Sequence, residues 1–255
     1  MKQLLLLTLC LITACKPNTK TEDPVSPQTE SAYPQNLENI LNAHAGLDTW
    51  DGYKTLSFTI PGEPVSETHT IDLHSRKDRV DRDSVSLGFD GERVWLYDPK
   101  NSYTGNPEFY HNLMFYFYAM PFVLADPGII YEETEALVVN DTSYAGLQIS
   151  FEPQTGASAN DEYYLYYDTE TYQMRWLGYT ATFGAEEKSD QITYIAYNDW
   201  QRVGEVVLPR SITWYASENG KPTTPRRTVN FDNVSLDEAS KPDAFYQKPA
   251  AADLN

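Results

Sequence analysis

The order of hydrophobic and polar residues predicts a chain built mainly from β-strands. Leu56, Phe58 and Ile60 alternate with polar residues within 54–60, and this period of two is typical of a half-buried strand. Similar short runs, bounded by turn residues, predict further strands at 68–74, 85–89, 94–97, 131–139, 144–151, 161–168, 172–183, 191–201, 205–215 and 227–236. Because hairpin-length connections join most of them, we expect about eleven antiparallel strands in a sheet that curls around helices.

Two segments follow the helical period instead. At 37–45 apolar residues recur three and four positions apart, and Gly46 ends the pattern. The run at 106–125, NPEFYHNLMFYFYAMPFVLA, is apolar almost all round, which predicts a buried central helix that Pro121 ends or kinks. One face of this helix carries Phe109, Leu113, Phe117 and Met120. The expected fold class is therefore mostly β (α+β), with a short N-terminal helix and a central apolar helix.

The first residues follow the pattern of a lipoprotein signal peptide. A charged start precedes an apolar run at 4–11, which is too short to span a membrane as a helix. The run leads into Leu-Ile-Thr-Ala-Cys at 11–15, the pattern of a bacterial lipobox. We therefore expect a signal peptide at 1–14 and lipidation of Cys15, which would anchor the protein to a membrane of the cell envelope. Lys16 is not the aspartate that retains enterobacterial lipoproteins, so the expected site is the outer membrane, in either leaflet.

The composition of the remaining chain suggests one domain between two irregular segments. Residues 15–35 are rich in Pro, Ser, Thr and charge, which predicts a flexible tether. Residues 36–240 contain no further linker and are expected to form a single β domain. Residues 241–255 are rich in Pro and Ala and are expected to be a frayed tail.

Charge and chemistry exclude several classes of function. The formal net charge of −18 repels nucleic-acid phosphates, so no nucleic-acid partner is expected. The only cysteines, Cys10 and Cys15, lie at the N-terminus, and no HExxH occurs, so we expect no metal and no cofactor. No GxSxG motif is present, although the many carboxylates leave open a hydrolase of unknown class.

Several segments resemble known families. The hairpin DGERVWLYD at 90–98 resembles one in lipoprotein-localisation (Lol-type) carriers. The residues His44 to Leu47 with Trp50, the run 109–126 and the segment 166–176 resemble a family of Bacteroidota lipoproteins to which no activity is assigned. The resemblance implies a half-barrel with helices plugging its mouth, whose interior holds acyl chains in Lol-type carriers. The lipobox is a departure from the periplasmic carriers and resembles the anchored receptor type.

These observations lead to one main hypothesis and two alternatives. The main hypothesis is a non-enzymatic, monomeric envelope lipoprotein that binds an apolar ligand, such as a lipid acyl chain, as a carrier or receptor. The candidate cavity residues are Phe109, Leu113, Phe117, Met120, Trp95, Trp176 and Trp214. The first alternative is an interaction or glycan-binding module with a filled core and an exposed aromatic patch. The second is the hydrolase, which requires a polar cleft.

Overall fold

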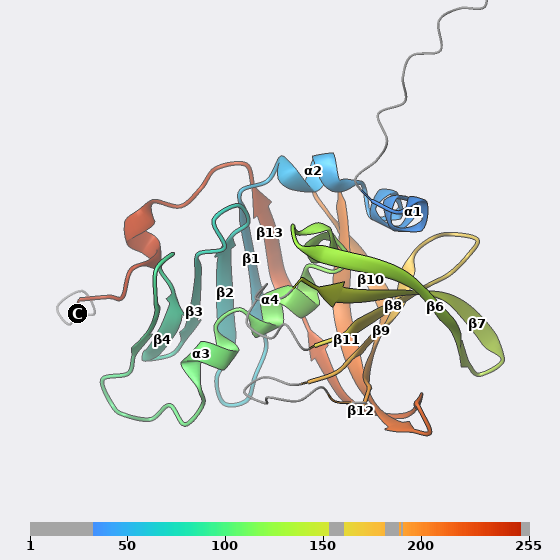
Figure 1. Ribbon diagram of the computed structural model, residues 1–255. Coiled ribbons are helices and arrows are strands. Elements are labelled where there is room, and N and C mark those ends of the chain that lie inside the picture. Colours follow the sequence, from blue (N-terminus) through green and yellow to red (C-terminus); the bar gives the residue numbers. More distant parts are fainter. Residues whose placement is uncertain (1–32, 153–160, 182–188, 190, 251–255) are drawn as a thin grey trace, which may run out of the picture. The chain divides into compact units, whose positions relative to one another are not determined.

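The computed structural model describes residues 33–152, 161–181, 189 and 191–250. The predicted signal peptide, the lipidation of Cys15 and most of the predicted tether lie outside the described residues. Within the described part the chain is mostly antiparallel β and forms two sheets that curve around short helices as an unclosed half-barrel (Figure 1). The predicted fold class is therefore confirmed.

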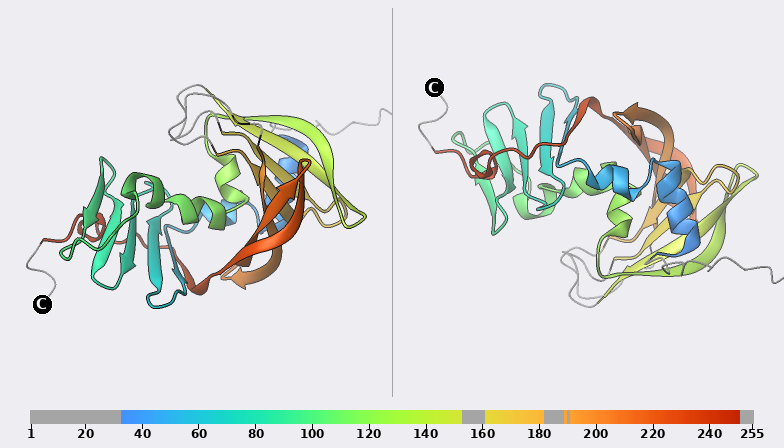
Figure 2. Two further views of the ribbon diagram at one scale, coloured as in Figure 1. Left: turned by 90° about the horizontal axis from the view of Figure 1, so that it is seen from below. Right: turned by 90° about the horizontal axis from the view of Figure 1, so that it is seen from above.

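The first sheet has six strands in the order β13-β1-β2-β3-β4-β5. Their bounds are β1 (Thr55–Ile60), β2 (Glu67–Asp72), β3 (Asp78–Arg82), β4 (Val85–Phe89), β5 (Val94–Tyr97) and β13 (Asp232–Asp237). The register pairs Phe58 of β1 with His69 of β2, and His69 with Val80 of β3, so these three side chains lie on one face. This face looks towards the short helices that lie between the two sheets (Figure 2).

The second sheet has seven strands in the order β12-β11-β10-β9-β8-β7-β6. They are β6 (Ile129–Val139), β7 (Thr142–Phe151), β8 (Tyr163–Tyr167), β9 (Met174–Tyr179), β10 (Thr193–Val203), β11 (Val206–Glu218) and β12 (Lys221–Asn230). Each of these strands pairs antiparallel with its neighbour in the chain. Sequential pairing of this kind is the arrangement that the hairpin-length connections predict.

Most of the helical segments pack between the two sheets, whereas the last one packs against Trp95 and Arg79, on the other face of the first sheet. They are α1 (Gln35–Ala43), α2 (Leu47–Asp51), α3 (Pro107–Tyr110), α4 (Leu113–Tyr118) and two 3₁₀ helices, η1 (Phe122–Ala125) and η2 (Asp243–Tyr246). Phe58 of the first sheet contacts Tyr118 of α4 with ring centroids 4.6 Å apart, and Trp50 of α2 stacks on Phe122 of η1 at 4.6 Å. These contacts place the centre of the core at the helices between the sheets.

The structure corrects the predicted helix at 106–125, which is three short pieces rather than one. Asn106 caps the first piece by accepting from the backbone N–H of Glu108, with Pro107 in the first turn as expected. The side chain of His111, just after α3, contacts Asp78 of β3 at 2.6 Å and ties the chain to the first sheet there. Pro121 follows α4 and cannot donate a helical hydrogen bond, so the helix ends before it.

The predicted count of about eleven strands is also too low, because the described residues contain thirteen. Strand β3 was not predicted, since Val80 is its single aliphatic residue. The strand expected at 227–236 is divided between β12 and β13, which belong to different sheets. Phe231 lies at the crossing, 2% exposed, and contacts Tyr118 with ring centroids 4.3 Å apart. Burial of this ring in the core thus fixes the point where the chain changes sheets.

The C-terminal tail expected from residue 241 is folded as far as η2. Tyr246 is 1% exposed, and its backbone carbonyl accepts a hydrogen bond of 2.8 Å from the indole N–H of Trp95. Its neighbour Phe245 lies under the guanidinium of Arg79, 5.3 Å from the ring centroid. Two aromatic side chains therefore hold a segment whose Pro and Ala content predicts disorder.

Candidate functional site

The main apolar groove of the described residues lies beside the broken central helix. Its volume is about 590 Å³. One wall comes from the chain between Glu108 and Leu124, and the other from residues at the ends of β6, β7 and β8, such as Ile129, Phe151 and Tyr163. The groove falls within the range of about 300–1,000 Å³ that is usual for small-molecule sites.

Four predicted cavity residues come together in the wall of this groove. They are Phe109, Leu113, Phe117 and Met120. Phe109 is 40% exposed, whereas Phe117 and Met120 are buried, so the wall passes from an open edge at α3 to a closed floor beyond α4. Flexible Met and flat aromatic side chains adapt to irregular apolar ligands.

The three predicted tryptophans lie outside the lining of the groove. Trp95 is in β5 of the first sheet and points towards η2. Trp214 lies behind the wall, edge-on to Phe117 with ring centroids 5.6 Å apart. Trp176 belongs to a second hydrophobic cluster with Tyr166 and Tyr194. Strand alternation separates Trp176 from its neighbour Leu177, which faces the main core.

Polar side chains that the sequence analysis did not identify line one edge of the groove. Arg76 donates through Nη2 to Asp126 at 2.5 Å, and its guanidinium lies 5.2 Å from the ring centroid of Phe115. Burial raises the pKa of Asp126, while Arg76 opposes this rise. Asp161, 8% exposed, also lines the groove. Arg76 lies in a turn between β2 and β3, where no sequence pattern connects it with residues 109–126.

The pair of His111 and Asp78 lies under the same wall. Asp78 is 1% exposed, and its Oδ2 is 2.6 Å from Nδ1 of His111. Burial raises the pKa of Asp78, and the contact with His111 opposes this effect. The pair fixes the position of the chain between α3 and α4, and therefore the distance between Phe109 and Leu113.

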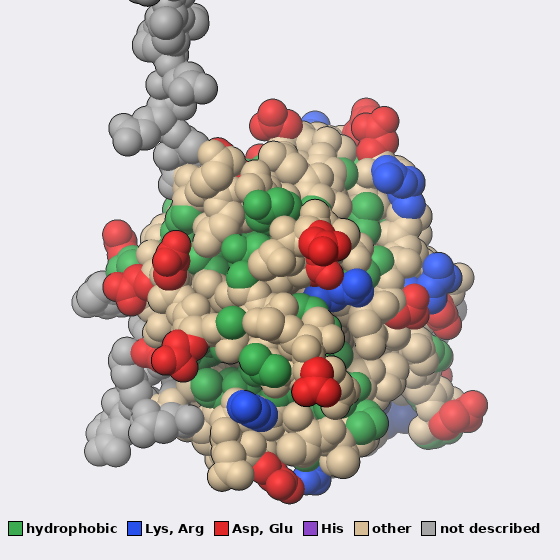
Figure 3. Space-filling model, turned by 90° about the vertical axis from the view of Figure 1, so that its right-hand side faces the viewer, with side chains coloured by type: hydrophobic (Ala, Val, Ile, Leu, Met, Phe, Trp, Pro, Cys, Tyr) green, Lys and Arg blue, Asp and Glu red, His purple; other side chains and the backbone are tan. Residues whose placement is uncertain are grey.

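Among the described residues, no three or more His, Cys, Asp and Glu side chains gather as a metal site. Asp and Glu side chains are spread over the face shown in Figure 3, with hydrophobic groups between them. No helix in the described part of the chain is long and apolar enough to cross a membrane.

Residues 97–224 match the model of DUF6503, a family of unknown function. The chain belongs to this family. The DUF6503 segment contains α3, α4, η1 and the strands β6 to β11. It therefore includes both apolar walls of the groove, while Arg76 comes from the chain before it.

Comparisons of the DUF6503 chain with other proteins give structural neighbours. No curated protein sequence matches it. A DUF1329 family protein from Desulfovibrio piger is 12% identical with a TM-score of 0.50, and the match covers 83% of this chain and 95% of that one. This likeness indicates a shared fold. A LolA superfamily protein from Nitrosomonas europaea is 8% identical with a TM-score of 0.38, covering 76% and 88% of the two chains. A putative outer membrane lipoprotein-sorting protein domain from Vibrio parahaemolyticus is 10% identical with a TM-score of 0.40, covering 80% and 97%.

Proposed function

We propose that the protein is a non-enzymatic lipid-binding lipoprotein that holds an acyl chain in the groove beside α4. The observation that carries this proposal is the groove of about 590 Å³, with Phe109, Leu113, Phe117 and Met120 in its wall. Removing an acyl chain from water is favourable by about 0.8 kcal/mol for each buried CH₂ group. A groove with an apolar floor can therefore bind such a chain without a strong polar contact.

The polar edge of the groove favours one orientation of an amphiphilic ligand. Arg76 and Asp126 lie at the edge, whereas Met120, Val123 and Leu124 are buried in the lining. An amphiphile would satisfy both environments by placing its chain over the apolar lining and its polar end beside Arg76 and Asp126.

The lipobox supports attachment of the protein to a membrane. With Cys15 acylated, the domain would be attached to the outer membrane through a tether and could exchange lipids near that membrane as a carrier or receptor. Its likeness in fold to the DUF1329 protein does not itself supply an activity. The anchor and the carrier role therefore rest on the sequence pattern together with the groove.

A titration of the full chain with a fluorescent fatty acid, 11-(dansylamino)undecanoic acid, tests this proposal. Binding should raise the dansyl emission in a saturable way. Leu113→Trp should weaken binding by about tenfold or more, because the indole fills the groove. Ile130→Trp is the matched control, since Ile130 is 44% exposed and lies outside the lining. No saturable binding, or equal binding by the two variants, would contradict the proposal.

A further inference from the structure

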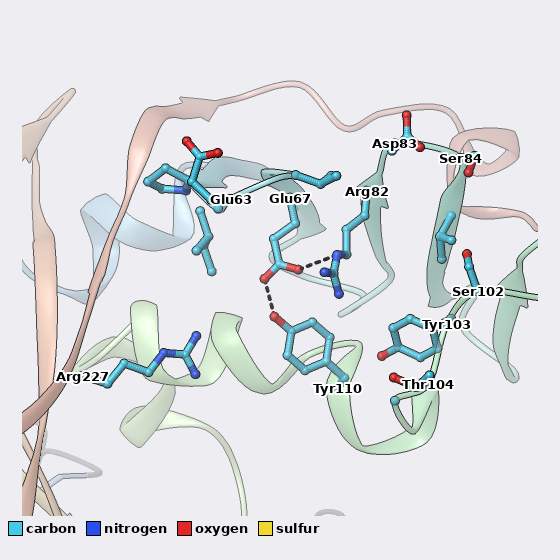
Figure 4. A pocket seen from close by; sticks show the side chains of 16 residues that line it. Glu63, Glu67, Arg82, Asp83, Ser84, Ser102, Tyr103, Thr104, Tyr110 and Arg227 are labelled. Carbon is cyan, nitrogen blue, oxygen red and sulfur yellow. Dashed lines mark hydrogen bonds and ion pairs between the residues drawn. The ribbon is translucent and has the colours of Figure 1, made fainter.

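A second pocket lies on the other side of α3 and differs from the groove in chemistry. Its volume is about 600 Å³. It is formed by the β1–β2 connection, the β3–β4 turn, the loop at 102–105, Tyr110 of α3 and Arg227 of β12 (Figure 4). Tyr110 faces this pocket, whereas its neighbours Phe109 and His111 line the apolar groove. The short helix α3 thus separates a polar pocket from an apolar one.

A nearly buried carboxylate organises one wall of the pocket. The Glu67 side chain is 11% exposed, accepts a hydrogen bond from the Tyr110 hydroxyl, and lies 3.5 Å from Nε of Arg82. His69 Nε2 is 3.5 Å from Oε1 of Glu67, the same oxygen that accepts from Tyr110, whereas Arg82 lies beside Oε2. Burial alone would raise the pKa of Glu67, but contacts with His69, Tyr110 and Arg82 hold it below its ordinary value. Glu67 is therefore a fixed anion that orients the phenol and the guanidinium.

These two oriented groups leave hydrogen-bonding capacity for a ligand. The Tyr110 oxygen donates its proton to Glu67, so its lone pairs remain to accept. Arg82 carries five N–H donors, and its contact with Glu67 is through Nε, so further donors remain on its 41% exposed side chain. In Figure 4 the side chains of Glu67, Arg82 and Tyr110 meet in the middle of the pocket.

A structured loop supplies the aromatic part of the opposite wall. The Asp98 carboxylate accepts from the backbone N–H of Tyr103 at 2.7 Å and from the Ser102 hydroxyl at 3.2 Å. The Tyr103 ring lies directly against Gly105, where a Cβ atom would come within 2.7 Å of the ring. Burial raises the pKa of Tyr103, so its hydroxyl stays protonated near neutral pH. Glycine at 105 thus permits the ring to form this wall.

The charges of the lining disfavour two classes of ligand, strong anions and apolar chains. The lining residues carry three carboxylates, on Glu63, Glu67 and Asp83, and two guanidiniums, on Arg82 and Arg227. This balance disfavours a strong anion, and the charged wall disfavours an apolar chain. Ser84, Ser102 and Thr104 add hydroxyls.

We propose that this pocket binds a polyhydroxylated molecule, a mono- or disaccharide. Each sugar hydroxyl both donates and accepts, which matches a wall where carboxylates and guanidiniums lie beside each other. The apolar C–H face of a sugar ring can pack on the Tyr103 or Tyr110 ring. The chemistry is the same for a free saccharide and for the sugar head of a glycolipid. The inference does not depend on lipid binding in the groove.

The test is a calorimetric titration of the full chain, kept in lauryldimethylamine oxide, a detergent without a sugar head. The panel is glucose, galactose, mannose, N-acetylglucosamine and maltose. At least one sugar should bind saturably. Thr104→Trp should abolish this binding by filling the pocket from an exposed position, and Thr104→Ser should retain it. Arg82→Lys, which keeps the charge beside Glu67 but loses the planar donors, should weaken binding by about tenfold.

Two results would overturn the inference. One is that no sugar of the panel binds, and the other is that a sugar binds equally to the wild type and to Thr104→Trp. A comparison of maltose with hexyl maltoside distinguishes a free saccharide from the sugar head of a glycolipid. Equal affinities assign the pocket to a free saccharide, and tighter binding of hexyl maltoside assigns it to a glycolipid. Saturable binding of the dansylated fatty acid is measured separately, so failure of the sugar titration leaves the proposed function standing.

Discussion

His44 shows how one side chain connects three parts of the fold. It is fully buried, its Nδ1 lies 3.3 Å from the Val207 carbonyl, and its Nε2 accepts from the backbone N–H of Met174 at 3.3 Å. The ring also contacts Trp200 edge-on with centroids 4.3 Å apart. These partners require a neutral imidazole with its proton on Nδ1, since a proton on Nε2 would face the Met174 N–H.

Burial of His44 should make the fold sensitive to acid. Burial lowers the pKa of His44 from 6.5 to about 4, although the hydrogen bond to Val207 opposes this shift. The unfolded chain therefore binds more protons than the folded one between pH 4 and 6.5, so stability rises with pH across this window. The stability that His44 contributes at pH 7 and that is lost below pH 4 is about 3 kcal/mol.

His44→Gln should remove this part of the pH dependence. Urea unfolding at pH 7 and at pH 4.5 measures it: the wild type should lose about 2–3 kcal/mol more than the variant on acidification. His74→Gln is the control, because His74 is exposed and makes its hydrogen bonds to the carbonyls of Asp51 and Tyr53. An equal loss in the wild type and His44→Gln would show that His44 is not the acid-sensitive group.

The C-terminal 3₁₀ helix η2 is folded where the sequence pattern predicts a frayed tail. Tyr246 is 1% exposed, so Tyr246→Ala should leave a cavity and cost about 3 kcal/mol or more of stability. The exposed neighbour Gln247 provides the control, since Gln247→Ala should change stability by less than about 0.5 kcal/mol. Thermal unfolding followed by circular dichroism measures both. If the two variants unfold alike, η2 does not contribute to the core.

Local periodicity predicts those strands and helices whose own residues show a regular alternation of apolar and polar positions. β1 begins one residue after its predicted start, and β4 and β5 coincide with the strands predicted at 85–89 and 94–97. β3 gives no such signal, because the sequence does not show that Asp78 will be buried opposite His111. Likewise, nothing near Phe231 indicates that its ring will enter the core and divide one predicted strand into two. Contacts between distant residues decide both features.

In the candidate site, too, some residues follow from local spacing and others come together only in the fold. The face formed by Phe109, Leu113, Phe117 and Met120 follows from helical spacing, and these residues line the groove although the helix is broken. Arg76 and Asp126 are 50 residues apart in the chain and meet only in the fold. The second pocket depends still more on tertiary contacts, since β2, β3, α3 and β12 each supply a side chain.

At the scale of the whole molecule, two sheets leave an apolar groove on one side of α3 and a polar pocket on the other. The phenol of Tyr110 is tied to Glu67, and the imidazole of His111 to Asp78, so both neighbours hold α3 against the first sheet. The four residues of α3 therefore lie between the apolar groove and the polar pocket. Acylation of Cys15 remains a prediction from the sequence pattern.

Native mass spectrometry of the full chain, with organic extraction of bound molecules, shows whether the groove beside α4 holds a lipid. We predict a stoichiometric lipid in the wild type and in Ile130→Trp, and its loss in Leu113→Trp, where the indole occupies the groove. A wild-type protein that carries no lipid and takes up neither fatty acids nor phospholipids when these are added would contradict lipid binding in the groove.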